Sequence, residues 1–330
     1  MLLGILVACS SDTTTTQSIE NVEVEEQKSD EKSSEEKTKK QKEAVEESAD
    51  ISYPYTYTDI AGRDVIIESQ PKRIVTTYLP LWETLMMLDI TPIGASGADN
   101  YKATWPPFQD VDLEDVVDVG GGNEANLELV ATLEPDIILD QAWDASNVDV
   151  MNFEKISPVA VFSTPTKMDW RLSMREVGKV VGKTEKAEAV INGVDETLKK
   201  AREKFQESYT DETVVLMSMM GVDRLVYAYR PDIYDKETGL GLNVPEGFSM
   251  STSYDDLTIE TLIEMDPDYL FVNVFKGDEA IYEELSNNSV WKSLSAVKNG
   301  NVYVIDGAGH ACSPMATIYT IEYIVEILTK

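Results

Sequence analysis

The phrase NLELVATLEPDIIL, from Asn126 to Leu139, decides the fold, because a second copy occurs 132 residues later. That copy is TIETLIEMDPDYLF, from Thr258 to Phe271, and in both copies Pro-Asp leads into an apolar run. A single repeat at this distance indicates two similar lobes, since a solenoid would repeat about every 20–50 residues. Two lobes in turn predict a cleft between them, which is where small ligands bind.

Each copy reads as a helix that feeds a strand. Asn126 and Thr258 are of the residue type that caps a helix, because a side-chain oxygen can accept the free N–H groups of the first turn. Glu128 and Glu260 follow in that turn, where negative charge suits the helix dipole. The proline of each copy disfavours helical geometry in the residue before it and so ends the helix. The apolar run after Pro-Asp then predicts a buried strand, which makes each copy half of an α/β unit.

The rest of the chain predicts an α/β fold of two Rossmann-like lobes. Short apolar runs alternate with helical segments at a spacing typical of parallel sheets, with the N-terminal lobe over 53–168 and the C-terminal lobe over 207–330. A long, mostly helical stretch over 169–206 lies between the two copies and is predicted to bridge the lobes. Its pattern predicts a break near Gly182, because glycine is a poor helix former.

The N-terminus resembles the end of a bacterial secretory signal with a lipobox. Residues 1–9 are apolar up to Leu6-Val7-Ala8-Cys9, which implies cleavage before Cys9 and its lipidation. Residues 10–52 are almost free of apolar side chains, with 13 acids and 6 bases between Ser10 and Asp50. Such a segment cannot bury enough surface to fold, so it predicts a disordered acidic tether. These features predict a lipid anchor on the extracellular face of the cytoplasmic membrane, of the Gram-positive type.

Composition excludes several classes of function. The net charge of −32 argues against nucleic-acid binding, which needs a basic face. The chain has one histidine, His310, which excludes a zinc or manganese site built from several imidazoles. The only cysteines are Cys9 and Cys312, so acylation of Cys9 leaves no disulfide framework. The sequence also lacks a glycine-rich phosphate loop and a nucleophile elbow, which disfavours an enzyme and a bound cofactor.

Several motifs in order resemble the substrate-binding proteins of class III (cluster A-II) ABC importers, which carry ferric siderophores, haem or cobalamin. The resemblance covers about residues 55–328. It rests on the phrase from Gly120 to Asp136, on the bridging helix centred at Ala187, and on Asp59, Gly62, Pro71-Lys72-Arg73-Ile74-Val75, Glu83, Leu85, Pro92-Ile93-Gly94 and 291–300. It implies a monomer that captures an iron chelate and delivers it to a permease, and through it to an ATPase. It also implies that Glu128 and Glu260, one on each lobe, dock onto arginines of that permease.

Aromatic and cationic residues follow the predicted strand ends, where ligand-contacting loops of α/β folds lie. Aromatic packing, cation–π contacts and charged hydrogen bonds suit a ferric siderophore, whose iron is already wrapped by its own oxygens. The predicted ligand-binding residues are Tyr78, Trp82, Tyr101, Lys102, Trp143, Arg171, Tyr229, Arg230, Phe275, Lys276 and His310.

The scattered cations of this acidic chain favour a hydroxamate or mixed-type siderophore over a triply charged catecholate complex. Haem is the alternative, because His310 and a methionine could supply an axial pair, and the resemblance also leaves cobalamin open. Two further classes remain as less favoured readings. One is an α/β enzyme in which paired acids such as Asp255 and Asp256 do acid–base work, and the other is a surface interaction lipoprotein without a cleft ligand.

Overall fold

The computed structural model describes residues 51–121, 125–142, 150, 152–163, 169–208, 211–221 and 224–329. The chain divides into a unit over Met1–Ala49 and a compact unit over Asp50–Lys330, and the second contains all of these residues. Cys9, the predicted signal over 1–9 and nearly all of the predicted tether lie outside the described residues. Within them, no helix is both long and apolar enough to cross a membrane.

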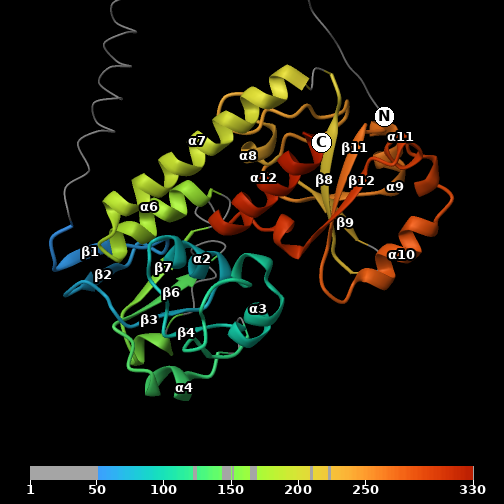
Figure 1. Cartoon of the computed structure of the whole chain (residues 1–330). Helices are drawn as coiled ribbons and strands as arrows, with labels where there is room; N and C mark the ends of the chain where they lie inside the picture. Colours follow the sequence, from blue (N-terminus) through green and yellow to red (C-terminus); the bar gives the residue numbers. More distant parts are fainter. Residues whose placement is uncertain are drawn as a thin grey trace, which may run out of the picture. The chain divides into compact units, whose positions relative to one another are not determined.

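The N-terminal lobe is built on a five-stranded sheet in the order β5-β4-β3-β6-β7, and all neighbouring strands are parallel (Figure 1). Its central strands β3 and β6 are mostly buried, as expected for a parallel sheet covered on both faces. A separate antiparallel hairpin precedes it. The elements are β1 (Tyr55–Thr58), β2 (Asp64–Ile67), β3 (Ile74–Thr76), α2 (Leu79–Met87), β4 (Gly94–Ala95), α3 (Ala98–Thr104), η1 (Pro106–Phe108), β5 (Val117–Asp118), α4 (Leu127–Thr132), β6 (Ile137–Gln141), η4 (Phe153–Lys155) and β7 (Val159–Phe162).

The C-terminal lobe also has a five-stranded sheet, in the order β10-β9-β8-β11-β12. Strands β8, β11 and β12 are parallel, whereas β9 runs antiparallel to both β8 and β10. The prediction of two Rossmann-like α/β lobes is thus confirmed, with an antiparallel edge that the sequence did not reveal. The elements are β8 (Val214–Met219), β9 (Leu225–Tyr227), α8 (Pro231–Tyr234), β10 (Asp255–Leu257), α9 (Ile259–Met265), β11 (Tyr269–Val274), α10 (Glu279–Asn287), η5 (Trp291–Ser293), α11 (Ser295–Asn299), β12 (Val302–Asp306), η6 (Gly307–His310) and α12 (Pro314–Leu328).

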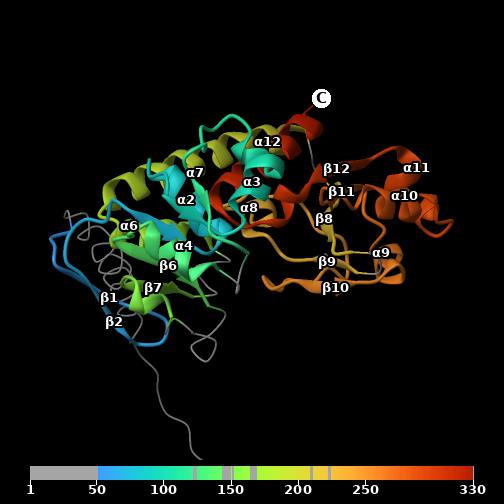
Figure 2. The same cartoon turned by 90° about the horizontal axis from the view of Figure 1, so that it is seen from below.

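Two helices connect the lobes, α6 (Trp170–Val180) and α7 (Thr184–Ser208). The helical stretch is interrupted near Gly182, which has a φ of 67°, a value that favours glycine. A side chain there would also meet the hydroxyl of Tyr53 at 2.6 Å from its Cβ. The helix pair runs along both lobes (Figures 1 and 2), and one hydrophobic core continues through both lobes and α7.

The two copies of the repeated phrase adopt the same local structure. Asn126 and Thr258 cap α4 and α9, each accepting a hydrogen bond from the main-chain N–H three residues further on. Glu134 and Asp266, which precede the two prolines, have φ values of 47° and 36°. Both helices therefore end within two residues of a position outside the right-handed helical region, which the following proline disfavours there.

The aspartate that follows each proline accepts hydrogen bonds from residues at the start of a neighbouring strand. Asp136 accepts hydrogen bonds from the main-chain N–H groups of Lys72 and Arg73, directly before β3. Asp268 accepts from the main-chain N–H and the hydroxyl of Thr213, directly before β8. In both lobes that strand pairs with the one that follows the phrase. The phrase therefore sets the alignment of the central strands as well as the helix before them.

Candidate ligand-binding site

A cavity of about 920 Å³ is lined by residues of both lobes. Its N-terminal side comes from the start of α2 and from α3 with the turn after it. Its C-terminal side comes from the ends of β11 and β12 and from the antiparallel edge of the sheet. The lining consists of Tyr78, Leu79, Pro80, Asn100, Tyr101, Thr104, Trp105, Pro106, Met220, Arg224, Val226, Tyr254, Phe275, Lys276, Asp306, Gly307, His310, Ala311 and Cys312.

Aromatic rings cover the N-terminal side of the cavity. The rings of Tyr101 and Trp105 meet edge to face, with centroids 5.9 Å apart, and Tyr78 lies at the start of α2. Burial raises the pKa of Tyr78 and of Tyr101 above the ordinary value, so both phenols are neutral at physiological pH. This side can therefore offer flat apolar contact and hydroxyl hydrogen bonds without adding charge.

A second aromatic cluster covers the C-terminal side. The ring of His310 stacks on Tyr254 with centroids 4.3 Å apart, and Phe275 meets it at 5.6 Å. Burial raises the pKa of Tyr254 well above its usual value, so this phenol is neutral too. The cavity thus has aromatic surfaces from both lobes.

Few charges lie on the cavity wall. The described lining carries two cations, Arg224 and Lys276, and one anion, Asp306. Arg224 forms an ion pair with Asp256 at 2.7 Å, and Asp306 accepts a hydrogen bond from Tyr319 at 2.8 Å. The described part of the chain contains no group of three or more His, Cys, Asp or Glu side chains that could hold a metal ion.

Five of the eleven predicted ligand-binding residues line the cavity, namely Tyr78, Tyr101, Phe275, Lys276 and His310. Their contact with a ligand stays a prediction. Trp143 lies outside the described residues. The other five, Trp82, Lys102, Arg171, Tyr229 and Arg230, are not part of the lining.

Two of these five are core residues. Trp82 is completely buried and packs on Phe108 with ring centroids 4.5 Å apart. Arg230 is buried and forms two hydrogen bonds with the carboxylate of Asp232, and it also donates to the main-chain oxygen of Gly309. Burial alone would lower the pKa of Arg230, but the adjacent carboxylate outweighs it and raises that pKa. Arg230 therefore supports the turn behind the cavity and does not reach into it.

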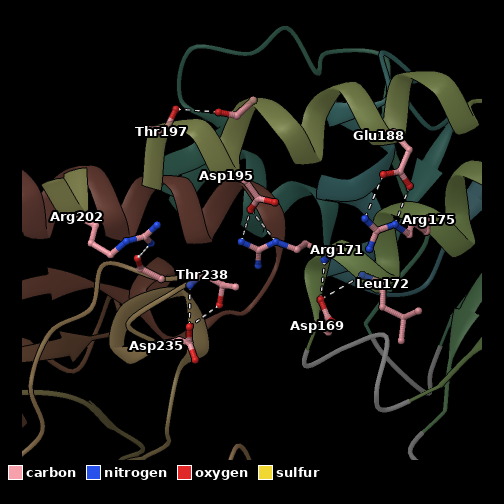
Figure 3. Close-up of polar contacts among 12 residues, drawn as sticks. Asp169, Arg171, Leu172, Arg175, Glu188, Asp195, Thr197, Arg202, Asp235 and Thr238 are labelled. Carbon is pink, nitrogen blue, oxygen red and sulfur yellow. Dashed lines mark hydrogen bonds and ion pairs between the residues drawn. The ribbon is translucent and has the colours of Figure 1, made fainter. Parts of the chain in front are cut away.

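Arg171 belongs to the bridging helices. Its guanidinium binds the carboxylate of Asp195 on α7, with a 2.8 Å bond from Nε (Figure 3). Arg175 makes a second such bridge to Glu188 one turn further along α6 (Figure 3). These pairs tie α6 to α7.

Lys102 and Tyr229 have partners away from the cavity. The ammonium group of Lys102 donates to the main-chain oxygen of Val116 at 2.9 Å and pairs with Asp99. The ring of Tyr229 packs on Tyr234 with centroids 5.7 Å apart. Both were predicted because they follow predicted strand ends, a rule that places a residue near the edge of a sheet without fixing the direction of its side chain.

Several lining residues were not predicted from the sequence. Asp306 ends β12 and Cys312 lies in the segment that follows it, so the strand-end rule applied to that strand would have found them. Trp105 follows α3, and nothing in its sequence context marks it as part of a ligand site. Tyr254 and Arg224 precede strands of the antiparallel edge, which the sequence did not reveal.

A buried carboxylate joins the two sides behind the lining. Glu83 on α2 accepts a 2.6 Å hydrogen bond from the indole of Trp105 and two bonds of 2.9 and 3.0 Å from the main-chain N–H groups of Met315 and Ala316. Ser313, the residue at the N-cap of α12, makes no capping bond of its own. Glu83 therefore caps a helix of the other lobe. Burial raises the pKa of Glu83, and these hydrogen bonds oppose that rise.

The two glutamates of the repeat are exposed in the first turns of α4 and α9. Within the described ranges neither Glu128 nor Glu260 forms an ion pair. Strand β10 is antiparallel to β9, and β9 to β8, so β10 runs in the direction of β8. Helices α4 and α9 thus both begin at the carboxyl edge of their sheets, the edge that carries the cavity. Docking at these positions stays a prediction.

Comparison with known proteins identifies relatives of the same architecture. Residues 74–308 match the model of a family described as periplasmic binding protein. The iron(3+)-hydroxamate-binding protein FhuD of Bacillus subtilis is 28% identical over 84% of this chain and 87% of its own. A solved FhuD fold-family component of a Fep/Fec-like ferrichrome ABC transporter from B. subtilis is 26% identical, with a TM-score of 0.68 over 83% of this chain and 100% of that one. FeuA of B. subtilis, complexed with ferri-bacillibactin, shares the fold at 22% identity, with a TM-score of 0.68 over 83% and 98%.

Proposed function

Because the chain belongs to the family of periplasmic binding proteins, we propose that its cavity captures a ferric siderophore and that the protein delivers this complex to an ABC permease. The family consists of substrate-binding proteins, so the chain is a binding protein and not an enzyme, as the sequence predicted. The observation that carries the proposal is the cavity with aromatic surfaces from both lobes.

The size and chemistry of the cavity fit a wrapped iron complex. Its volume of about 920 Å³ is at the upper end of the range of about 300–1,000 Å³ that is usual for ligand pockets. The aromatic surfaces can pack against the organic shell of a chelate, and the neutral phenols of Tyr78, Tyr101 and Tyr254 can hydrogen-bond to its oxygens. The iron itself needs no ligand from the protein.

The charges on the wall favour a hydroxamate or mixed-type siderophore. Two cations and one anion in the described lining leave little excess positive charge to offset a triply negative catecholate complex. A neutral or weakly charged complex would lose less when it leaves water. The 28% identity to a protein named for iron(3+)-hydroxamate binding supports the same class.

Haem is the second candidate because His310 lines the cavity. Cobalamin belongs to the same set of alternatives. A surface interaction lipoprotein would need no such cavity, so the aromatic lining favours small-molecule binding.

Anchoring and docking complete the proposal. Cys9 would carry the lipid, with the acidic tether linking it to the lobes, and stable anchoring would need more than one acyl chain. The monomeric protein would dock through Glu128 and Glu260 onto a permease that is coupled to an ATPase. The support is their exposure and their place on the cavity side of the two sheets, one on each lobe. The site of action would be the extracellular face of the cytoplasmic membrane.

Tryptophan fluorescence tests the ligand, because Trp105 lies in the lining. Ferric hydroxamates should quench the emission at low concentration, ferric catecholates should bind more weakly, and haemin and cobalamin should leave it unchanged beyond their own absorption. The iron-free hydroxamate is the matched control. Equal affinity for the iron-free and ferric forms would reject a ferric siderophore as the ligand.

A further inference from the structure

The indole ring of Trp105 is held at the cavity wall from behind. Only 7% of the residue is exposed, and its ring nitrogen donates a 2.6 Å hydrogen bond to Oε1 of Glu83. The indole N–H is the only polar group of the side chain, so this bond selects one orientation of the ring. Glu83 is completely buried, so water does not readily compete for the bond.

The position of Tyr101 depends on the ring of Trp105. The two rings meet edge to face at an angle of 80°, with centroids 5.9 Å apart. The ring of Tyr101 also packs close to the main chain at Gly97, where a Cβ would lie 3.2 Å from it. Tyr101 is less buried than Trp105, and both line the cavity. A chain of contacts therefore runs from Glu83 through Trp105 to Tyr101.

The second oxygen of Glu83 binds the first turn of α12, a helix of the other lobe. Oε2 accepts hydrogen bonds from the main-chain N–H groups of Met315 and Ala316, where α12 reaches α2 (Figure 1). One turn further along α12, the hydroxyl of Tyr319 donates a 2.8 Å hydrogen bond to Asp306 in the cavity lining. Helix α12 is thus bound to a wall residue of its own lobe through Tyr319 and to one of the other lobe through Glu83.

The surroundings of Glu83 require an acceptor at both oxygens. A glutamine amide has one accepting oxygen and one donating nitrogen. In Glu83→Gln this nitrogen would face either the single indole N–H of Trp105 or the two main-chain N–H groups of α12. The orientation with fewer opposed donors keeps the oxygen on α12. The substitution should therefore release Trp105 while the contact between the lobes remains.

We propose that Glu83 is a positioning residue for ligand binding. Without touching the ligand, it holds the aromatic wall formed by Trp105 and Tyr101 in the geometry that the ligand meets, and it attaches this wall to α12. The inference rests on the proposed function for the ligand and deepens it. A wall that is fixed before binding loses less side-chain entropy when the ligand arrives. The buried carboxylate therefore raises the affinity for a ferric chelate whose organic shell packs on these rings.

Nitrogen-15 NMR of the ligand-free protein, labelled at tryptophan, tests whether Glu83 holds Trp105. The variant Trp105→Phe assigns the indole resonance, because that variant lacks it. In the wild type this resonance should lie downfield and its hydrogen should exchange slowly with water. Glu83→Gln should move the resonance upfield and speed the exchange. The same position and exchange rate in the wild type and in Glu83→Gln would overturn the inference.

Calorimetric titration with a neutral ferric trihydroxamate as the probe tests the effect on binding. Glu83→Gln should weaken binding by about ten-fold, as expected when a wall that was fixed in advance becomes mobile. Trp105→Phe removes the same hydrogen bond from the other side. Adding Glu83→Gln to Trp105→Phe should therefore change the affinity by less than about two-fold. Unchanged affinity in Glu83→Gln, or a full ten-fold loss on adding it to Trp105→Phe, would contradict the positioning role.

The control for a general loss of stability is Asp136→Ala. This substitution removes contacts of the same lobe away from the cavity lining, so its affinity should stay within about two-fold of the wild type. A ten-fold loss in this variant too would attribute the effect to stability and reject the positioning role. If the wild type binds no ferric chelate, the proposed function fails, whereas the NMR result still decides whether Glu83 holds Trp105.

Discussion

The two lobes share one scaffold and differ in how they build the cavity wall. In both, a capped helix, a proline and a strand-fastening aspartate follow in the same order. The N-terminal lobe forms its wall from α2, α3 and the turn after α3, whereas the C-terminal lobe uses strand ends and an antiparallel edge. The comparison teaches that the repeat preserves the sheet and its connections, while recognition depends on segments that the lobes do not share.

The largest effect is expected from reversing the charge of the two equivalent glutamates, one on each lobe. Glu128→Lys combined with Glu260→Lys should abolish iron uptake in cells, because both proposed permease contacts become repulsive. Ferric siderophore affinity of the purified protein should stay unchanged, since both residues lie outside the cavity lining.

The control for this experiment is a double variant with the same change in net charge. Glu114 and Glu246 are exposed glutamates, one on each lobe and neither on α4 or α9, and their reversal to lysine should leave uptake intact. Equal loss of uptake in both double variants would show that net charge, and not docking, is responsible.

The next largest effect is a loss of stability when Glu83, which contacts residues of the other lobe, is replaced. Glu83→Ala removes a buried carboxylate that serves Trp105 and the start of α12. It should lower the free energy of unfolding by about 3 kcal/mol, because two buried donors and one partly buried donor lose their acceptor. Urea unfolding followed by tryptophan emission measures this, with exposed Glu68 changed to alanine as the control. A loss no larger than that of the control would mean that Glu83 does not join the lobes.

A smaller loss of stability is expected when the equivalent aspartates of the two lobes are replaced, and its size should differ between the lobes. Asp136→Ala and Asp268→Ala each remove the acceptor that fastens a central strand. We expect losses of about 1 kcal/mol for the exposed Asp136 and about 2 kcal/mol for the half-buried Asp268, because burial makes an unpaired donor more costly. Chemical denaturation of the two variants, with the asparagine variants as controls that retain an oxygen acceptor, checks the order. The reverse order would show that burial does not set the strength of these contacts.

The smallest effect depends on pH. At the left-handed position before proline, Asp266 accepts hydrogen bonds from the hydroxyl and N–H of Ser295, which lower the pKa of Asp266 below its usual 3.8. A lowered folded-state pKa adds stability above the unfolded value, and this stability is lost as the pH falls through the folded value. In Asp266→Asn, the free energy of unfolding should therefore fall slightly less steeply with decreasing pH in the acid range than it does in the wild type. Glu134→Gln, at the equivalent place in the other lobe, is the control, and an equal flattening in both would contradict the prediction.

Much of the scaffold could be predicted because its determinants are local. The caps at Asn126 and Thr258 and the helix ends before proline follow from residue type and spacing alone. The roles of Asp136 and Asp268 escaped prediction because their partners lie more than 50 residues away in the chain.

The cavity was predictable only in part. Phe275, Lys276 and His310 were found because they follow strands whose ends must meet at one edge. Trp82 and Arg230 have the same residue character and similar positions, yet their side chains turn into the core. Which way a side chain turns depends on the space left by its neighbours, and residue type and spacing do not specify that space.

The sequence by itself determined that the chain folds into two α/β lobes with a bridging helical segment, because helix caps, proline stops and apolar periodicity act within a few residues. Only the tertiary structure decided which residues form the cavity wall, that Glu83 caps a helix of the other lobe, and that the same carboxylate binds the indole of Trp105. These features join segments that are distant in the chain. They exist only once the packed lobes exclude water and leave each buried polar group a small set of partners.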